Sequence, residues 1–297
     1  MGFLMILATS ILWSFSSIAV KMVSNNVNAY VISFSTYVFA VLVLGIYQFK
    51  KHKSLKINFK EPWIWIGAIG VTSGWVLRNV ATHLGHAYGV ILINPIQTIM
   101  MFLISKFCFK EKISLKSWGA AMLCVVGIFI VGWNGAPLGD IVKSGSITLL
   151  LLYLLSGAGE SIHMISEKVL IEKMDSVSIN YSIFFLSLLI TSPFPFIFGV
   201  DVNLIDLKTL SLMVYLGAFS TGFGFYLYTQ ALKQTPFMMA VIELKMYIVV
   251  GMAFYKRADY YLYYLRGSDV YYRNYFVKPI SRGKSYKNCR RYMIATC

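Results

Sequence analysis

Two consecutive stretches decide the fold of this chain: IWIGAIGVTSGW at 64–75 and GHAYGVILINPIQTIMMFLISKFCFKEKISLKSWGAAMLCVVGIFIVG at 85–132. They contain three long apolar runs, a proline inside the second run, and a cluster of lysines around one glutamate. A gapless shift of 150 residues aligns Gly217, Ala218, Gly224, Leu227 and Ala231 with identical residues of the first half. This common register is typical of a duplicated membrane unit.

The composition indicates a membrane protein. The chain has 297 residues, a mean hydropathy of +0.67 and only 13% charged residues, whereas soluble domains carry about 25%. Runs of roughly 20 apolar residues, enough for a helix to cross a ~30 Å hydrocarbon core, recur along the chain. Since backbone polar groups in lipid must be satisfied within the segment, these runs should be helices. We therefore predict an all-α, polytopic membrane protein.

Nine apolar spans are expected before residue 255. They cover about 3–23, 29–49, 62–82, 87–108, 117–134, 147–167, 177–199, 211–232 and a run that begins at Pro236. Because a unit of five spans is odd, the second unit must enter the membrane from the opposite side. The lysine-rich loop at 50–60 is expected to be cytoplasmic, which places the N-terminus on the same side of a cell membrane.

The positive charge does not indicate a nucleic-acid partner. Of the formal charge of +15, ten Lys and Arg residues lie in the segment 255–297 against Asp259 and Asp269, and most of the others lie in loops beside apolar spans. Membrane lipids are the expected partner of such loops. The four cysteines show no CxxC or metal-ligand spacing, so neither a metal nor another cofactor is expected.

The sixth span carries the densest polar stripe, because Ser156, Glu160, His163 and Glu167 share one helix face. Carboxylates deep in a membrane are rare and costly, so Glu160 is a functional candidate. With His163 it forms a pair suited to relaying protons or binding a cationic group, and a neutral Glu–His hydrogen bond inside the bundle is the structural alternative. Glu167 is expected to be solvated at the cytoplasmic end, beside Lys168.

Two further spans of the first half contain unusual residues. Gly70 and Gly74 form a GxxxG pattern that permits close helix contact, and Arg78 beyond them must pair, face a cavity or reach the interface. In the fourth span, Pro95 predicts a kink. Asn94 and Gln97 lie three residues apart on one face, so the kink is a candidate for a binding site.

The first and ninth spans supply the remaining candidates. A stripe of Ser and Lys residues follows one face of the first span, and indicates either hydrogen bonds between helices or a pathway lining. Trp13 lies beside this stripe and is a candidate at the outer side. Glu243 and Lys245 in the ninth span are two residues apart, so they cannot share a face and at least one needs a partner on another helix.

The sequence changes character at Tyr255. Ten of the 20 tyrosines lie in 255–297, where no long apolar run remains. Three interpretations compete: a reading-frame shift, a divergent tail on the surface, and an unusual lipid-binding segment. We favour the frame shift, because the change falls where a further helix of the repeat is due.

Up to about residue 254 the chain resembles the EamA-like transporters of the drug/metabolite transporter superfamily. The resemblance rests on ILWSFSSIAVK at 11–21, on the run at 87–132, and on LGAFSTGFGFYLYTQAL at 216–232. Family members have small residues before a mid-helix proline, here Pro95, then a glutamate, here Glu111. A fifth helix with spaced glycines, here Gly119 and Gly127, follows.

The resemblance implies ten helices in two inverted five-helix repeats and secondary transport by alternating access. The corresponding divisions are a first repeat at 1–134, an outer linker at 135–146, an incomplete second repeat at 147–254 and the basic tail at 255–297. The chain departs from the family where Glu243 and Lys245 stand near the expected proline, and where the tenth helix is missing or replaced.

The first functional hypothesis is a carrier that exports, imports or exchanges a small polar metabolite. The residues expected to bind it are Glu160, His163, Asn94, Gln97, Glu243, Lys245, Arg78 and Trp13. Charges of both signs suit a zwitterionic or amine-bearing solute, with proton coupling through Glu160 as a further hypothesis. Homodimer formation stays open. The alternatives are a non-transporting partner subunit or defective pseudo-transporter, and a membrane-embedded lipid-modifying enzyme, for which no nucleophile or paired-carboxylate motif is found.

Overall fold

The structure, a computed structural model, describes residues 1–84, 93–107, 110, 118–119, 122–123, 126, 146–200 and 205–235. The chain divides into two compact units, Met1–Met252 and Ala253–Cys297, and every described residue belongs to the first. Several expected features lie outside the described residues: most of the fifth span and of the linker, the ninth span, the tail at 255–297, and Glu111, Glu243 and Lys245.

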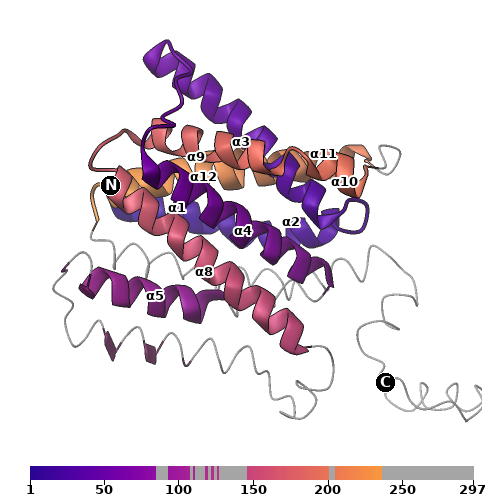
Figure 1. Cartoon of the computed structure of the whole chain (residues 1–297), viewed down its shortest axis with the longest axis horizontal. Helices are drawn as coiled ribbons and strands as arrows, with labels where there is room; N and C mark the ends of the chain where they lie inside the picture. Colours follow the sequence, from indigo (N-terminus) through magenta and orange to yellow (C-terminus); the bar gives the residue numbers. More distant parts are fainter. Residues whose placement is uncertain are drawn as a thin grey trace, which may run out of the picture. The chain divides into compact units, whose positions relative to one another are not determined.

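All regular secondary structure in the described part of the chain is helical (Figure 1). The helices are α1 (Gly2–Ser14), α2 (Ser16–Val23), α3 (Ala29–His52), α4 (Pro62–Leu84), α5 (Ile93–Phe107), α8 (Ser146–Leu170), α9 (Ser176–Thr191), α10 (Phe194–Phe198), α11 (Leu207–Val214), the π-helix η3 (Tyr215–Phe223) and α12 (Gly224–Leu232). The predicted all-α class is confirmed, and the inverted ten-helix plan stays a prediction.

Four helical stretches of the described chain are long and apolar enough to cross a membrane: Gly2–Val23, Ala29–His52, Ser176–Phe198 and Leu207–Leu232. They coincide with the first, second, seventh and eighth predicted spans. Helices α4 and α8 coincide with the third and sixth, and their 23 and 25 residues are also enough to span a hydrocarbon core. These two helices carry charged residues in their interiors, so their faces are not uniformly apolar.

Helices α4 and α8 cross at a contact between glycines, as the GxxxG pattern predicted. A Cβ atom added at Gly159 would lie 2.7 Å from the carbonyl oxygen of Gly70 and 2.8 Å from the backbone nitrogen of Gly74. Backbones can approach this closely only where no side chain stands between them. The contact holds the polar face of α8 directly against α4.

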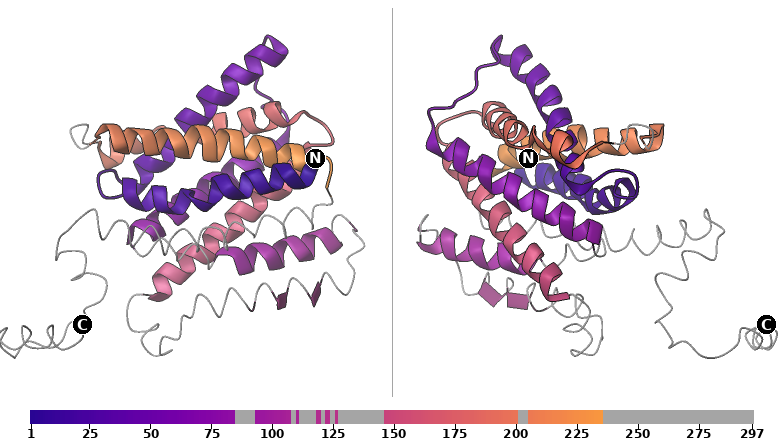
Figure 2. Two further views of the ribbon diagram at one scale, coloured as in Figure 1. Left: turned by 180° about the vertical axis from the view of Figure 1, so that it is seen from behind. Right: turned by 45° about the vertical axis from the view of Figure 1, so that its right-hand side comes forward.

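Three other helix pairings build the bundle. Helix α1 runs beside α12 (Figure 2), and α3 packs against η3 and α9. A cluster of aromatic rings fills the space between them: Tyr37 stacks on Trp75 with ring centroids 5.5 Å apart, and Phe184 and Phe225 pack at 5.5 Å. Aromatic pairs at such distances add to the free energy of burial.

A charged cluster holds the end of α3 to the start of α9. Asp175 caps α9 by accepting a hydrogen bond from the backbone of Val177, and lies 3.0 Å from Lys51 Nζ and 3.1 Å from His52 Nε2. Burial alone would raise the pKa of Asp175, but the hydrogen bonds from Ser178 and Lys51 and the charge of Lys51 hold it well below its usual range.

The close contact between α4 and α8 predicts that a larger residue at Gly159 destabilises the protein. Changing Gly159→Ala should lower the free energy of unfolding by about 1–3 kcal/mol, because backbone atoms of α4 cannot give way to the new methyl group. Gly119→Ala is the matched control, since among the described residues nothing lies within 4 Å of its added Cβ. Thermal unfolding in detergent measures both variants, and equal behaviour of the two would contradict the close approach.

The charged cluster makes a second prediction. Asp175→Asn keeps a side chain that caps helices well and removes only the charge, so it should cost about 1 kcal/mol of stability at neutral pH. Because the pKa of Asp175 is lowered in the folded state, this contribution should be present above the ordinary Asp pKa of about 3.9 and fade as the pH falls below it. Unfolding curves of the wild type and of Asp175→Asn at several pH values measure this contribution, with Glu172→Gln as an exposed control. A difference in stability between the wild type and Asp175→Asn that grew in acid would contradict the prediction.

Candidate functional site

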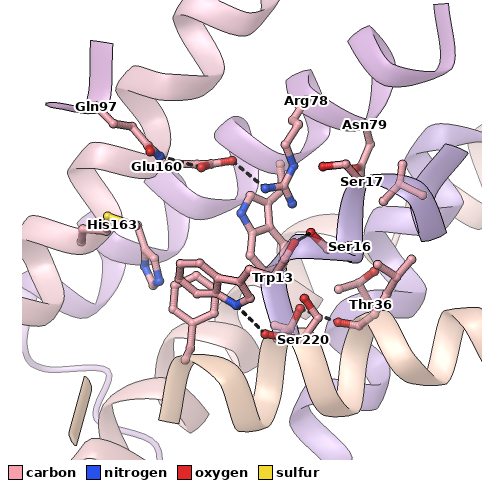
Figure 3. Close-up of a pocket in the computed structure, with 16 residues that line it drawn as sticks. Trp13, Ser16, Ser17, Thr36, Arg78, Asn79, Gln97, Glu160, His163 and Ser220 are labelled. Carbon is pink, nitrogen blue, oxygen red and sulfur yellow. Dashed lines mark hydrogen bonds and ion pairs between the residues drawn. The ribbon is translucent and has the colours of Figure 1, made fainter. Parts of the chain in front are cut away.

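A pocket lies inside the helical bundle (Figure 3). It is lined by residues of α1, α2, α3, α4, α5, α8, η3 and α12: Trp13, Ser16, Ser17, Val20, Thr36, Trp75, Arg78, Asn79, Gln97, Glu160, His163, Met164, Leu216, Ser220, Thr221 and Phe225. The lining combines charged groups, hydroxyls and aromatic rings. This composition is typical of a site for a small polar ligand.

An ion pair and a hydrogen bond hold the carboxylate of Glu160 on the pocket wall. Arg78 Nη1 lies 3.0 Å from Glu160 Oε1, and Gln97 Nε2 donates to Glu160 Oε2 at 2.7 Å. The side chains of Arg78 and Glu160 are 19% and 12% exposed. Helices α4 and α5 therefore each bind one oxygen of a carboxylate carried by α8, and the charges still face the pocket.

The glycine contact explains why this ion pair forms. A Cβ atom at Gly74 would lie 3.0 Å from Glu160 Cγ, and Arg78 stands one helical turn after Gly74. The guanidinium also lies over the ring of Trp75, 5.1 Å from its centroid. Such cation–π contact stabilises a charge that has lost part of its hydration.

Two irregular helical segments form the opposite wall. The break at Phe15 separates α1 from α2, and the π-helix η3 faces it. Trp13 Nε1 donates to the carbonyl oxygen of Ser220 at 2.8 Å, and the Trp13 ring lies 4.5 Å from that of Phe225. π-Helical turns are uncommon and often occur at functional sites, so this wall is built from backbone that departs from the regular helix.

The pocket brings together most of the predicted candidates that the structure describes. Trp13, Arg78, Gln97, Glu160 and His163 all line it. Helix α5 contains Asn94 and Pro95, but their side chains lie outside the described residues, and so does the chain just before Ile93. The predicted kink at Pro95 therefore stays a prediction.

The expected pairing along α8 is different in the structure. The sequence predicted that Glu160 and His163 act together, whereas Glu160 is bound by Arg78 and Gln97 and the Nε2 of His163 lies 3.8 Å from Glu167 Oε1. The prediction that Glu167 is solvated was wrong, since its side chain is 0% exposed. Its face of α8 turns toward α12, where Thr229 contacts it at 2.9 Å.

Several lining residues were not candidates from the sequence. Asn79 is a polar residue in an apolar span and donates from Nδ2 to Ser33 Oγ at 2.9 Å, so its polarity was a usable signal. Trp75 and Phe225 carried no such signal, because aromatic residues make up 16% of the chain. Ser220 contributes its backbone carbonyl, which no side-chain pattern reveals.

Comparison with known proteins identifies the family. The model of the EamA-like transporter family matches residues 1–133 and 147–255, which together are most of the chain. The chain belongs to the EamA-like transporter family. Members of this family are membrane transporters, and the apolar helices agree with that class.

Two individual proteins are similar to this EamA-family chain. The probable 4-amino-4-deoxy-L-arabinose-phosphoundecaprenol flippase subunit ArnE of Pseudomonas fluorescens (strain Pf0-1) is 26% identical over 78 residues, which span 25% of this chain and 66% of that relative. A solved structure titled "Crystal structure of protein" superposes with a TM-score of 0.71 at 14% identity, over 87% of this chain and 88% of that one. The latter likeness concerns the fold alone.

A double-mutant cycle tests whether Arg78 and Glu160 are coupled in the stability of the protein. Arg78→Gln and Glu160→Gln should each destabilise the protein, because each leaves a partly buried charge without its partner. The double variant should recover part of the loss, with a coupling energy of about 0.5–3 kcal/mol. Unfolding in detergent measures all four proteins.

The control for this cycle is the pair of Lys173 and Glu61, whose atoms lie 2.9 Å apart but whose side chains are 51% and 23% exposed. Exposed pairs of this kind contribute little. Strict additivity of the Arg78 and Glu160 substitutions, equal to that of the control pair, would show that the two charges are not coupled.

Proposed function

We propose that this protein carries a small polar metabolite with charges of both signs across the cell membrane by alternating access. The observation that carries the proposal is the ion pair of Arg78 and Glu160, held between α4 and α8 on the wall of the pocket. Charges within membrane helices are costly and are typical of substrate or ion pathways. Family membership supplies the class of activity.

A zwitterionic solute fits this wall by exchange of partners. Its ammonium group takes the place of the guanidinium at Glu160, and its carboxylate binds the freed Arg78 through two parallel hydrogen bonds. Trp13, Trp75 and Phe225 provide an apolar surface for the rest of the molecule. The exchange leaves each charge paired, so binding does not require either group to stay unpaired in the bundle.

The proposed architecture is a pair of inverted repeats on the ten-helix plan, a first repeat of five helices at 1–134 and an incomplete second repeat of four at 147–254, with a cytoplasmic N-terminus. Reciprocal contacts in the repeat register support it. The carbonyl of Ser220 accepts from Trp13, and a Cβ atom at Gly70 would lie 3.1 Å from the backbone nitrogen of His163. The shift of 150 residues relates Gly70 to Ser220 and Trp13 to His163, so the repeat register exchanges the two contacts, as expected of paired repeats.

A second candidate function is a subunit of a larger transporter. The name of the ArnE relative describes a flippase subunit, and the sequence of this chain departs from the ten-helix plan after residue 254. Under this alternative the chain acts only with a second membrane protein. Co-purification of a membrane protein in stoichiometric amount would favour it, and transport by the purified chain alone would exclude it.

The test of the carrier function uses the full chain in proteoliposomes with a panel of radiolabelled solutes: a zwitterionic amino acid, a diamine and a dicarboxylate. We expect uptake of the zwitterion to exceed that of the other two. Arg78→Gln or Glu160→Gln should reduce it about tenfold or more, which corresponds to ~1.4 kcal/mol of lost binding.

Lys173→Gln, which breaks the exposed ion pair outside the pocket, should leave uptake unchanged. Equal uptake by wild type and both pocket variants would contradict the assignment of the site. Preference for the diamine would contradict the zwitterion.

A further inference from the structure

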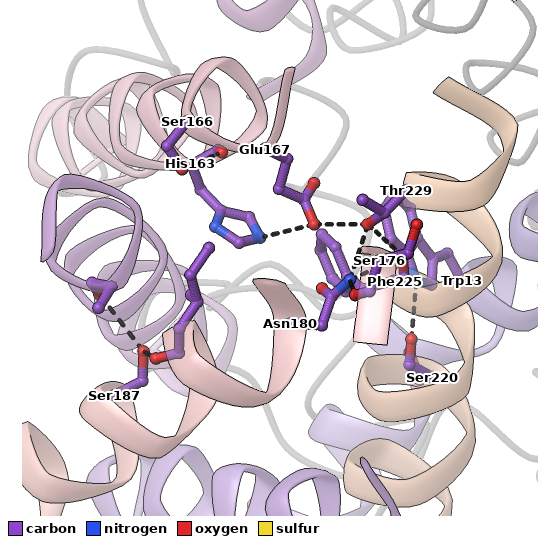
Figure 4. A network of polar contacts seen from close by, with 12 residues as sticks. Trp13, His163, Ser166, Glu167, Ser176, Asn180, Ser187, Ser220, Phe225 and Thr229 are labelled. Atoms are coloured by element: carbon purple, nitrogen blue, oxygen red, sulfur yellow. Dashed lines mark hydrogen bonds and ion pairs between the residues drawn. The ribbon is translucent and has the colours of Figure 1, made fainter. Parts of the chain in front are cut away.

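A second polar cluster lies behind the pocket, at the junction of α8, α9 and α12 (Figure 4). Glu167, Asn180 and Thr229 form it, and each side chain is fully buried. The hydroxyl of Thr229 is at its centre, 2.9 Å from Glu167 Oε1, 2.8 Å from Asn180 Nδ2 and 2.7 Å from the carbonyl oxygen of Phe225. These three contacts decide how much hydrogen bonding the carboxyl group of Glu167 receives.

The contacts of the Asn180 side chain fix the orientation of its amide group. Its Nδ2 atom lies 2.8 Å from the carbonyl oxygen of Ser176 as well as 2.8 Å from Thr229 Oγ1. A carbonyl oxygen only accepts, so the atom facing Ser176 must be the amide nitrogen. The amide has two N–H groups, and one of them donates to Thr229. This contact uses one lone pair of the hydroxyl.

The remaining two contacts of Thr229 both face acceptors, and the hydroxyl has one hydrogen for them. Thr229 Oγ1 lies within donating distance of Glu167 Oε1 at 2.9 Å and of the carbonyl oxygen of Phe225 at 2.7 Å. The carboxyl group of Glu167 therefore shares a single hydroxyl donor with a backbone carbonyl, which is little stabilisation for a buried carboxylate.

The surroundings of Glu167 also favour its neutral form. Within the part of the chain that the structure describes, its ion-pair partner is His163, at 3.8 Å, and its Oε2 has no hydrogen-bond partner. The other titratable group that faces it is Tyr228 of α12. From α9 it meets Asn180 through Thr229, while Asp175 is held by Lys51 and His52. A buried carboxylate with so few partners is costly as an anion.

We propose that Glu167 is a proton-binding site connected to the pocket through His163. The ring of His163 lines the pocket and its Nε2 faces Glu167 at 3.8 Å, about 1 Å beyond a hydrogen bond. When the helices close this gap, the O–H bond of Glu167 breaks and an N–H bond forms at Nε2. The imidazolium then releases its Nδ1 proton to water when the pocket opens around this atom, which is buried in the described structure, and the neutral ring remains.

This assignment deepens the carrier proposal and rests on it only for the use of the proton in transport. It gives the two glutamates of α8 different roles. Glu160 is held as a charge by Arg78 and binds solute, while Glu167, two helical turns further along, holds the proton. Arg78 balances the negative charge of Glu160 in the described structure, and the ammonium group of the solute balances it when the solute is bound.

The test is infrared difference spectroscopy on the full chain in lipid, which detects the carbonyl stretch of a protonated carboxylic acid. We expect a band at neutral pH that is lost in alkaline buffer, absent in Glu167→Gln, and retained in Glu172→Gln, an exposed glutamate beside the same helix. A band that is unchanged in Glu167→Gln, or no band in the wild type, would overturn the proposal.

Two further measurements keep the test decisive if Glu167→Gln fails to fold. Thr229→Val removes the hydroxyl that hydrogen-bonds the carboxyl group and should shift the band to higher frequency, and an unshifted band would overturn the geometry. Replacing choline chloride by sodium chloride at fixed pH should leave the band unchanged. Loss of the band in sodium would assign the site to that cation instead. None of these readouts needs a transported solute, so they fail or succeed independently of the uptake assay.

Discussion

The close approach of α4 and α8 is the constraint on which the described structure depends. Three glycines, Gly70, Gly74 and Gly159, allow the two backbones to meet without intervening side chains. In a bilayer, helices gain little from hiding apolar surface from one another, so close packing and polar contacts stabilise the contact. The same contact places Arg78 against Glu160, and it therefore sets both the fold of this region and the charge of the pocket.

The polar face of α8 serves two environments. Glu160 points into the pocket, where a guanidinium and an amide bind its oxygens. Glu167 points into the junction with α12, where hydroxyl and amide groups surround it. A charge is stable in the first environment because it is paired, and a neutral acid suits the second because few donors face the buried carboxyl group. His163 stands between them and borders both.

Departures from regular helix concentrate on the wall opposite to that face. The break at Phe15 and the π-helical turn through Ser220 lie together, joined by the bond from the Trp13 indole to the Ser220 carbonyl. A backbone carbonyl that lacks its partner within its own helix is tolerated in a membrane only where another protein group donates a hydrogen bond to it. Irregular backbone of this kind forms one side of a pocket whose other side is held by an ion pair.

The sequence by itself determined the class of fold, the positions of the described spans and the identity of the family. Apolar runs of membrane length and basic loops are local properties, so they can be read from one chain. It also singled out Arg78, Gln97 and Glu160 as unusual, because a charge or amide in an apolar run is visible in isolation.

Only the tertiary structure decided which of these residues meet. The expected pair of Glu160 and His163 lies on one helix. In the structure, Arg78 and Gln97 from two other helices bind the carboxylate of Glu160 instead. Glu167 looked solvated beside Lys168, since the sequence does not show that α9 and α12 cover its face. Burial and partner choice depend on helices distant in the sequence, and that is why the pocket and the polar cluster behind it required the structure.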